Sequence, residues 1–191
     1  MAATSLVRHV LYATTRGAIS PRSSVKPSWH KELNRFSLYA CSSWFYTVVG
    51  VHGLCMFLSC PTVYPGWPPH IAIPDVTLVM LQGIWSFNSD VRNIGLTSKW
   101  HVVDRLTAQA LTLFQVVKFA YFLVPPVLSP AQFAFVWLGF FVAFFCKLQG
   151  YKAIVDASLP RFKFWHTLWH ISLPLTHIIL QSWRWRACAL G

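Results

Sequence analysis

Three histidines, His166, His170 and His177, lie close together near the end of the chain. If this stretch is a helix, steps of about 100° per residue place the three imidazoles within roughly 60° of one another on one face. The surrounding residues, 162–183, hold about enough apolar side chains to cross a bilayer. Ionisable side chains at such a depth are costly unless they have a partner or a function, so these histidines are candidates for chemistry.

A second pair of polar residues, His101 and Asp104, lies three positions apart and therefore on one face of a helix. Three neutral imidazoles from His101, His166 and His170 would make a suitable tetrahedral zinc shell, with a water in the fourth position and Asp104 to orient it. His177 lies about 10 Å deeper than His170 by helix rise, which is too far for the same ion. The sequence thus predicts a zinc site with an open, catalytic type of coordination.

The spacing Thr97-x3-His101-x2-Asp104, followed by His166-x3-His170, resembles the CREST superfamily of membrane hydrolases. That superfamily includes alkaline ceramidases, adiponectin receptors and GPI-lipid remodelling proteins. Its members build a zinc site from a Ser-x3-His segment, a following Asp and a His-x3-His in the last helix, and this site is thought to activate water against lipid amides or esters. The resemblance rests on two short motifs. It implies that His101, His166 and His170 bind zinc, that Asp104 holds the water, and that Thr97 replaces the serine.

The elements that must position these residues follow from composition. Hydrophobic residues make up 55% of the 191-residue chain and charged residues only 11%, which is outside the usual balance of soluble proteins. We therefore expect an all-α, multi-pass transmembrane helical bundle of about five spans, with a polar turn formed by Asn88, Ser89, Asp90 and Gly95. The expected spans are residues 37–60, 71–87, 100–124, 130–146 and 162–183.

Basic residues alternate between the expected loops. Six precede the first span, and others lie between spans two and three and between spans four and five, whereas 61–70 and 125–129 contain neither Lys nor Arg. The positive-inside tendency then predicts an N-terminus on the matrix or cytoplasmic side. It also predicts that His101, Asp104, His166 and His170 lie at a similar depth near one leaflet, because both pairs open a span at its inner end.

The first 36 residues form a basic arm, and the first thirty of them contain no acidic residue. This profile is typical of a mitochondrial or plastid transit peptide, and the alternative is an ordinary basic tail. We expect a single transmembrane domain at 37–186, a short tail at 187–191 and a place in the mitochondrial inner membrane, with an ER or Golgi membrane as the alternative. The formal net charge of +11 indicates anionic lipid or an acidic partner. Nucleic acid is not expected, because the basic residues lie in loops between spans.

Three functions from different classes are consistent with the sequence. The first is an accessory subunit of a respiratory-type complex, built on a CREST-like bundle with a zinc site and contacting other membrane subunits. The second is an active zinc-dependent lipid amide or ester hydrolase, in which Asp104 takes a proton from water. The third is haem b binding by two histidines, such as His52 or His101 with one from the last span. The structural alternative is that the histidines only form hydrogen bonds between helices.

Overall fold

The structure is a computed structural model that describes residues 28–59, 69–121 and 128–189. Within these residues every regular element is a helix, which confirms the all-α prediction. The basic segment before residue 28, most of the expected loops at 61–70 and 125–129, and the last two residues lie outside them. The helices are α2 (Trp29–Glu32), α3 (Leu38–Ser42), α4 (Trp44–Ser59), α5 (Pro69–Ser86), η2 (Phe87–Arg92), α6 (Lys99–Tyr121), α7 (Pro130–Val155) and α8 (Leu159–Ala189).

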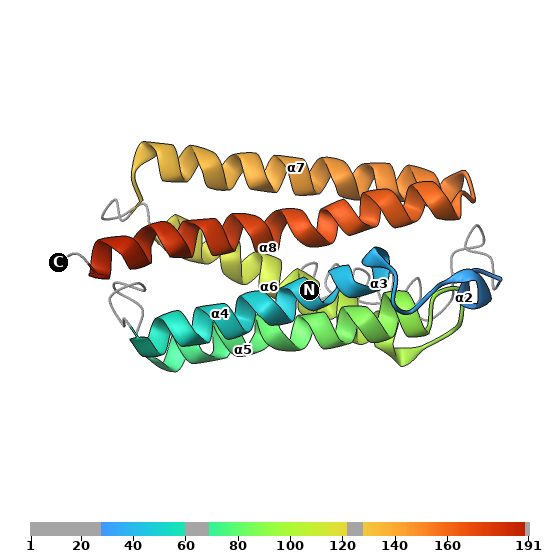
Figure 1. Ribbon diagram of the computed structural model, residues 1–191, viewed down its shortest axis with the longest axis horizontal. Coiled ribbons are helices and arrows are strands. Elements are labelled where there is room, and N and C mark those ends of the chain that lie inside the picture. Colours follow the sequence, from blue (N-terminus) through green and yellow to red (C-terminus); the bar gives the residue numbers. More distant parts are fainter. Residues whose placement is uncertain (1–27, 60–68, 122–127, 190–191) are drawn as a thin grey trace, which may run out of the picture.

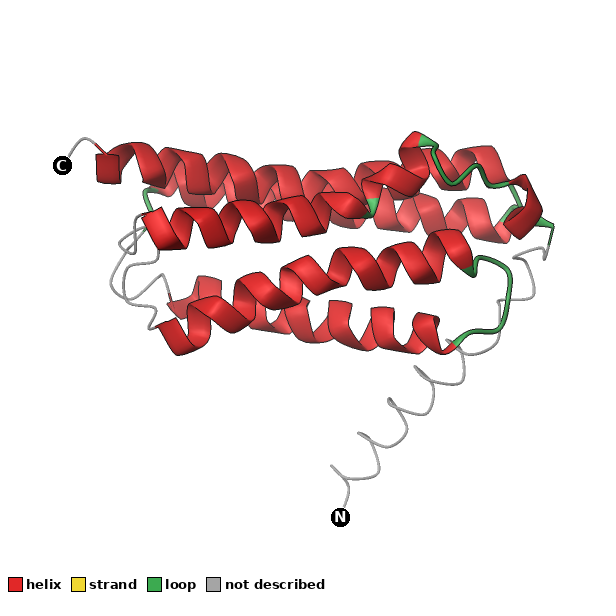
Figure 2. Cartoon of the chain, turned by 60° about the horizontal axis from the view of Figure 1, so that its bottom comes forward, coloured by secondary structure: helices red, strands yellow, loops and turns green. Residues whose placement is uncertain are grey.

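The long helices run side by side along one axis. Helices α7 and α8 form one antiparallel pair, and α4 and α5 form a second pair below it (Figure 1). Helix α4 also packs against α8, which joins the two pairs, and α6 packs against α5. Figure 2 shows the same bundle from another side, with the chain reversing direction at each end. Residues from distant parts of the sequence therefore meet inside the bundle.

The close approach of α4 and α5 depends on two glycines. A Cβ atom at Gly50 would lie 2.7 Å from the backbone nitrogen of Met80 and 2.8 Å from the carbonyl oxygen of Val76. A Cβ atom at Gly83 would lie 2.9 Å from the carbonyl oxygen of Ser43. Any side chain at these positions would push the helices apart, so small residues set their spacing, as is common between helices in membranes.

Two helical segments of the described chain, Leu38–Ser59 and Pro130–Val155, are long and apolar enough to cross a membrane. The other expected spans correspond to α5, α6 and α8 in position, and α8 extends beyond the expected bounds at both ends. Helix α7 leaves large apolar side chains exposed on its outer face, namely Trp137, Leu138, Phe141, Phe144 and Phe145. Such a surface fits lipid or another apolar partner.

The prediction of a polar turn is wrong for Asn88, Ser89 and Asp90, which lie in a helix. Instead of ending, α5 continues directly into the π-helix η2, and the turn begins only at Asn93. The amide of Leu96 donates to the carbonyl of Asn93, and Gly95 has a positive φ of 73° that suits glycine. Short π-helical segments inside helices often occur at functional sites. Here the segment keeps Ser89 and Val91 buried within the bundle.

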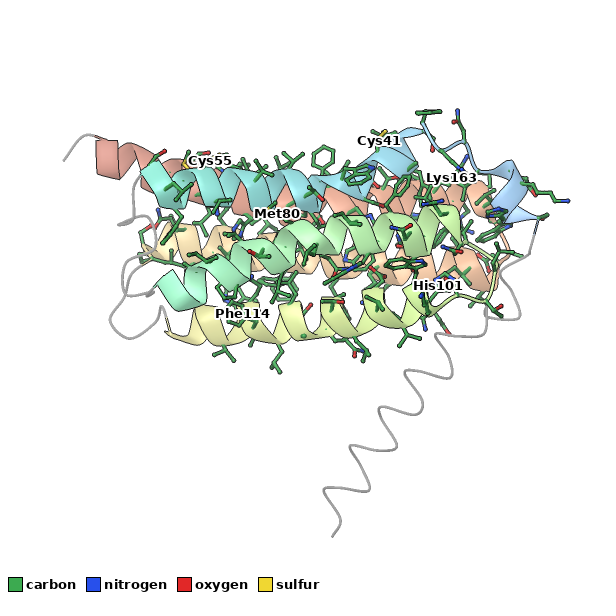
Figure 3. The ribbon with its side chains drawn as sticks, turned by 90° about the horizontal axis from the view of Figure 1, so that it is seen from below. Cys41, Cys55, Met80, His101, Phe114 and Lys163 are labelled. Atoms are coloured by element: carbon green, nitrogen blue, oxygen red, sulfur yellow. The ribbon has the colours of Figure 1, made fainter. Side chains whose placement is uncertain are left out.

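A core cluster closes the bundle at the end where α8 begins. Trp29 is only 2% exposed and stacks on Phe162, with their ring centroids 5.5 Å apart. Tyr39 packs on the same Phe162 ring. Figure 3 labels His101 and Lys163 at this end, while Cys55 and Phe114 lie toward the other. The segment from residue 28 onward is therefore packed against the helices that carry the predicted site.

Candidate metal centre

His166 and His170 lie one turn apart on α8, and their rings face each other with centroids 4.3 Å apart. The residue that meets them is Asp90 of η2. Its Oδ2 lies 2.9 Å from Nε2 of His166 and 3.7 Å from Nε2 of His170. One ligand atom from each of the three side chains lies within 4.8 Å of the others. These residues form a compact group that could hold a metal ion, which we call the metal group.

The donors of the metal group fit zinc. Zinc binds imidazole nitrogen and carboxylate oxygen at about 2.0–2.2 Å, so the ligand atoms of a tetrahedral site lie roughly 3.3–3.5 Å apart. The Asp90 oxygen lies close to this spacing from both histidine nitrogens. Closing around an ion would require only small rotations of the side chains. Three protein ligands leave a coordination position for water or substrate, as in catalytic zinc sites.

Neighbouring side chains hold the metal group in place. Nδ1 of His170 lies 3.5 Å from Oγ of Ser43. When Nδ1 donates a hydrogen bond there, the lone pair of Nε2 points toward Asp90, which is the tautomer that a metal ligand needs. The Tyr39 hydroxyl donates to the backbone carbonyl of Asp90 at 2.8 Å, and Ser89 donates to Oδ1 of Asp90 at 3.0 Å. His170 is only 1% exposed, so this geometry is enclosed.

Opposing effects act on the Asp90 carboxyl. Burial favours its neutral form, but the charge of His166 and the hydrogen bond from its ring outweigh this effect. His170 and the hydroxyl of Ser89 act in the same direction. Together they hold the pKa of Asp90 well below its usual value, so the group is an ionised ligand at neutral pH.

The expected ligand His101 lies next to the metal group but is not one of its three residues. Its Nδ1 is 2.8 Å from Oγ of Ser89, and its Nε2 donates to the carbonyls of Leu96 at 2.9 Å and Asn93 at 3.1 Å. Both ring nitrogens of His101 therefore form hydrogen bonds within the protein. His101 reaches the carboxylate of Asp90 only through Ser89, in the position of an outer residue that supports a ligand.

Asp104, the expected catalytic carboxylate, lies on α6 and lines a cavity that His170 also lines. Its Oδ1 accepts hydrogen bonds from the hydroxyl of Ser86 at 2.6 Å and the side-chain amide of Gln82 at 2.7 Å. Thr97, expected in the role of a serine next to the site, is instead exposed in the loop that precedes α6. The hydroxyl that contacts Asp104 comes from Ser86, on the helix that leads to Asp90.

A cavity of about 230 Å³ begins beside the metal group. Its polar side chains near that end are Tyr46, Gln82, Ser86, Asp104, Lys147 and His170, supplied by five helices. The cavity extends along α8 from His170 to Leu180, about 15 Å by helix rise, between mainly apolar walls. The combination of a polar end and a long apolar part has the shape of a site for an amphiphilic molecule.

The metal group can bind a metal ion. Its member His170 shares a cavity with Asp104, a carboxylate that could accept a proton from water. No family model, curated protein or solved structure matches the chain. The chemistry of the site is therefore inferred from its own donors. A signal in the sequence could have indicated Asp90 and Ser86, because they have the spacing Ser-x3-Asp and Asp104 follows later in the chain.

The remaining candidate histidines lie in a separate hydrogen-bond network. Nε2 of His177 lies 2.9 Å from the side-chain amide of Gln181, and Oε1 of Gln181 lies 2.8 Å from Nδ1 of His52. His177 lines the cavity toward its far end. The haem alternative relied on His52 or His101, and both ring nitrogens of His101 are bonded within the protein. The group of described residues that could hold a metal ion is Asp90, His166 and His170.

Proposed function

We propose that the chain is a zinc-dependent membrane hydrolase that cleaves an amide or ester bond of a lipid. The observation that carries the proposal is the position of Asp104, which borders the same cavity as the metal ligand His170. A buried metal group, a second carboxylate and an apolar cavity are the parts that such a reaction needs. A structural zinc site would not require the cavity or the carboxylate.

We propose that all five long helical segments cross the membrane. Two of them are apolar enough by themselves. Of the remaining three, α5 and α8 bury several polar side chains in the interior, including Asp75 at 2% and Gln181 at 4% exposure. Polar residues that face the interior of a bundle are tolerated in a bilayer. In this arrangement the metal group lies near the membrane surface that carries the basic loops, on the matrix or cytoplasmic side.

The bound zinc would supply Lewis acidity and would lower the pKa of water. The residues of the chain do the rest. Asp90, His166 and His170 provide the ligands, and Oδ2 of Asp104 accepts the proton, because its Oδ1 is already bonded to Ser86 and Gln82. These two bonds also fix the orientation of the carboxylate. The apolar walls hold the acyl chain and keep bulk water away from the reacting bond.

The proposed relation to the CREST superfamily is sharpened by this geometry. The motif of that superfamily, a serine four residues before a ligand with a later aspartate, is matched by Ser86-x3-Asp90 and the later Asp104. Asp90 then takes the place of a histidine, and His166 and His170 match the last-helix pair. Two contacts support this alignment: Ser86 bonds to Asp104, and Asp90 lies 2.9 Å from His166.

The test is release of fatty acid by protein purified in mild detergent and loaded with zinc. The substrates are a panel of ceramides, glycerol esters and GPI-like lipids. We expect at least one class to be cleaved, and Asp104→Asn to lower its rate of cleavage about 10²–10⁴-fold while zinc remains bound. Asp156→Asn is the matched variant, because Asp156 is an exposed carboxylate paired with Arg161 far from the cavity. A zinc-loaded protein with no turnover on the whole panel would refute the proposal.

The second candidate is the accessory subunit of a respiratory-type complex in the mitochondrial inner membrane. The exposed aromatic face of α7 favours it, because this surface suits another membrane subunit as well as anionic or neutral lipid. An ER or Golgi membrane is the alternative location. Native-gel electrophoresis of membranes solubilised in digitonin separates these functions: a subunit migrates with a large complex, whereas an independent hydrolase migrates alone.

A further inference from the structure

Among the described residues that line the cavity, Lys147 is the one with a positively charged Lys or Arg side chain. It lies on α7, within the apolar segment Pro130–Val155 that could cross a membrane. Its side chain is exposed on one side and borders the cavity on the other, so it lies at the rim. A cation that borders a cavity is a candidate partner for an anionic ligand.

The ammonium group of Lys147 is directed to the polar end of the cavity. Its Nζ lies 4.8 Å from the ring centroid of Trp169, within the range of a cation–π contact. The Trp169 ring in turn lies 5.2 Å from the His170 ring and 5.3 Å from the His166 ring. One aromatic ring therefore separates the cation from the metal group. A lysine that only extended its head to the membrane surface would have no reason to rest on this ring.

We propose that Lys147 binds the anionic head of an amphiphilic ligand whose chain fills the cavity. This inference rests on the proposed function only in taking the ligand to be a lipid. Such a ligand has a negatively charged carboxylate or phosphate at one end of a single long apolar chain. Asp104 is a carboxylate on the α6 side of the same end, so repulsion directs an anion away from α6 and toward Lys147 on α7.

This arrangement gives each wall of the cavity a separate role. The α7 side attracts the negative head, the α5 and α6 side holds the proton-accepting carboxylate, and α8 presents the metal group. A carboxylate product formed next to His170 would then have a cation within reach on the neighbouring wall. Lys147 thereby determines which lipids bind, as a specificity-determining residue that takes no part in proton transfer.

The test measures binding of three probes of equal chain length: a saturated fatty acid, the monoalkyl phosphate and the uncharged fatty alcohol. Equilibrium dialysis uses the full chain in nanodiscs of neutral lipid, before and after treatment with a chelator. The chelator separates direct binding of the anion to a metal from its binding to Lys147. We expect an anion to bind more tightly than the alcohol, and the stronger of the two anions identifies the head group.

Lys147→Gln should weaken binding of that anion about tenfold or more and leave the alcohol unchanged. Lys147→Arg should keep the preference because it keeps the charge. Lys152→Gln, on an exposed face of the same helix and outside the cavity, should change nothing. Equal binding of all three probes, or equal weakening of all three by Lys147→Gln, would overturn the proposal. Because binding requires no turnover, failure of the hydrolase proposal leaves this result interpretable.

Discussion

Oδ2 of Asp90 lies 2.9 Å from Nε2 of His166, although 76 residues separate them in the sequence. This contact joins the end of the α4–α5 pair to the start of α8. The same two residues belong to the group that could hold a metal ion.

Removal of a metal ligand should remove the metal. Purified protein should contain about one zinc per chain by elemental analysis, and His170→Ala or Asp90→Ala should reduce this to a background level. His177→Ala is the matched variant, because His177 belongs to the Gln181 network and should keep its zinc. Protein that contains no zinc and gains none on titration would contradict the assignment of the site.

His101→Ala distinguishes an outer supporting residue from a ligand. The variant should still bind about one zinc per chain, with affinity lowered about 10–100-fold through Ser89. It should also lose roughly 1–3 kcal/mol of stability, because Ser89 and two loop carbonyls lose their partner. Zinc titration and thermal unfolding in detergent measure the two effects. Complete loss of zinc would instead support the sequence-based assignment of His101 as a ligand.

Asp104→Asn should lower turnover about 10²–10⁴-fold, the usual contribution of a positioned general base. Ser86→Ala should have a smaller effect, about tenfold, because Gln82 still holds Oδ1 of Asp104. Initial rates of fatty-acid release under saturating zinc give both values, and zinc content measured in parallel should be unchanged. If Ser86→Ala is as inactive as Asp104→Asn, the serine takes part in the reaction itself.

Trp29→Ala should lower stability by about 3–5 kcal/mol, the usual cost of deleting a buried aromatic side chain. Trp29 is 2% exposed and stacks on Phe162, one turn before His166. Thermal unfolding followed by near-UV circular dichroism measures the change. Phe36→Ala is the comparison, since Phe36 is 91% exposed and should be nearly neutral. An equally neutral Trp29→Ala would mean that the segment before residue 37 does not pack on the bundle in solution.

The sequence by itself determined the helices and the pairing of His166 with His170. Apolar runs bounded by proline and glycine clusters define helices, and helical periodicity places residues four apart on one face, so neither inference needs a tertiary contact. It also placed Asp104 on the same helical face as His101, because the two residues are three positions apart.

Only the tertiary structure placed Asp90 beside His166 and His170. Asp90 lies in a polar stretch that local residue preferences assign to a turn, whereas the structure continues it as a π-helix. The direction of its side chain depends on that helical register and on the packing of η2 against α3 and α6, which are long-range effects. The hydrogen bonds of His101 could not be predicted from the sequence for the same reason. They go to loop carbonyls that are placed only when the bundle is assembled.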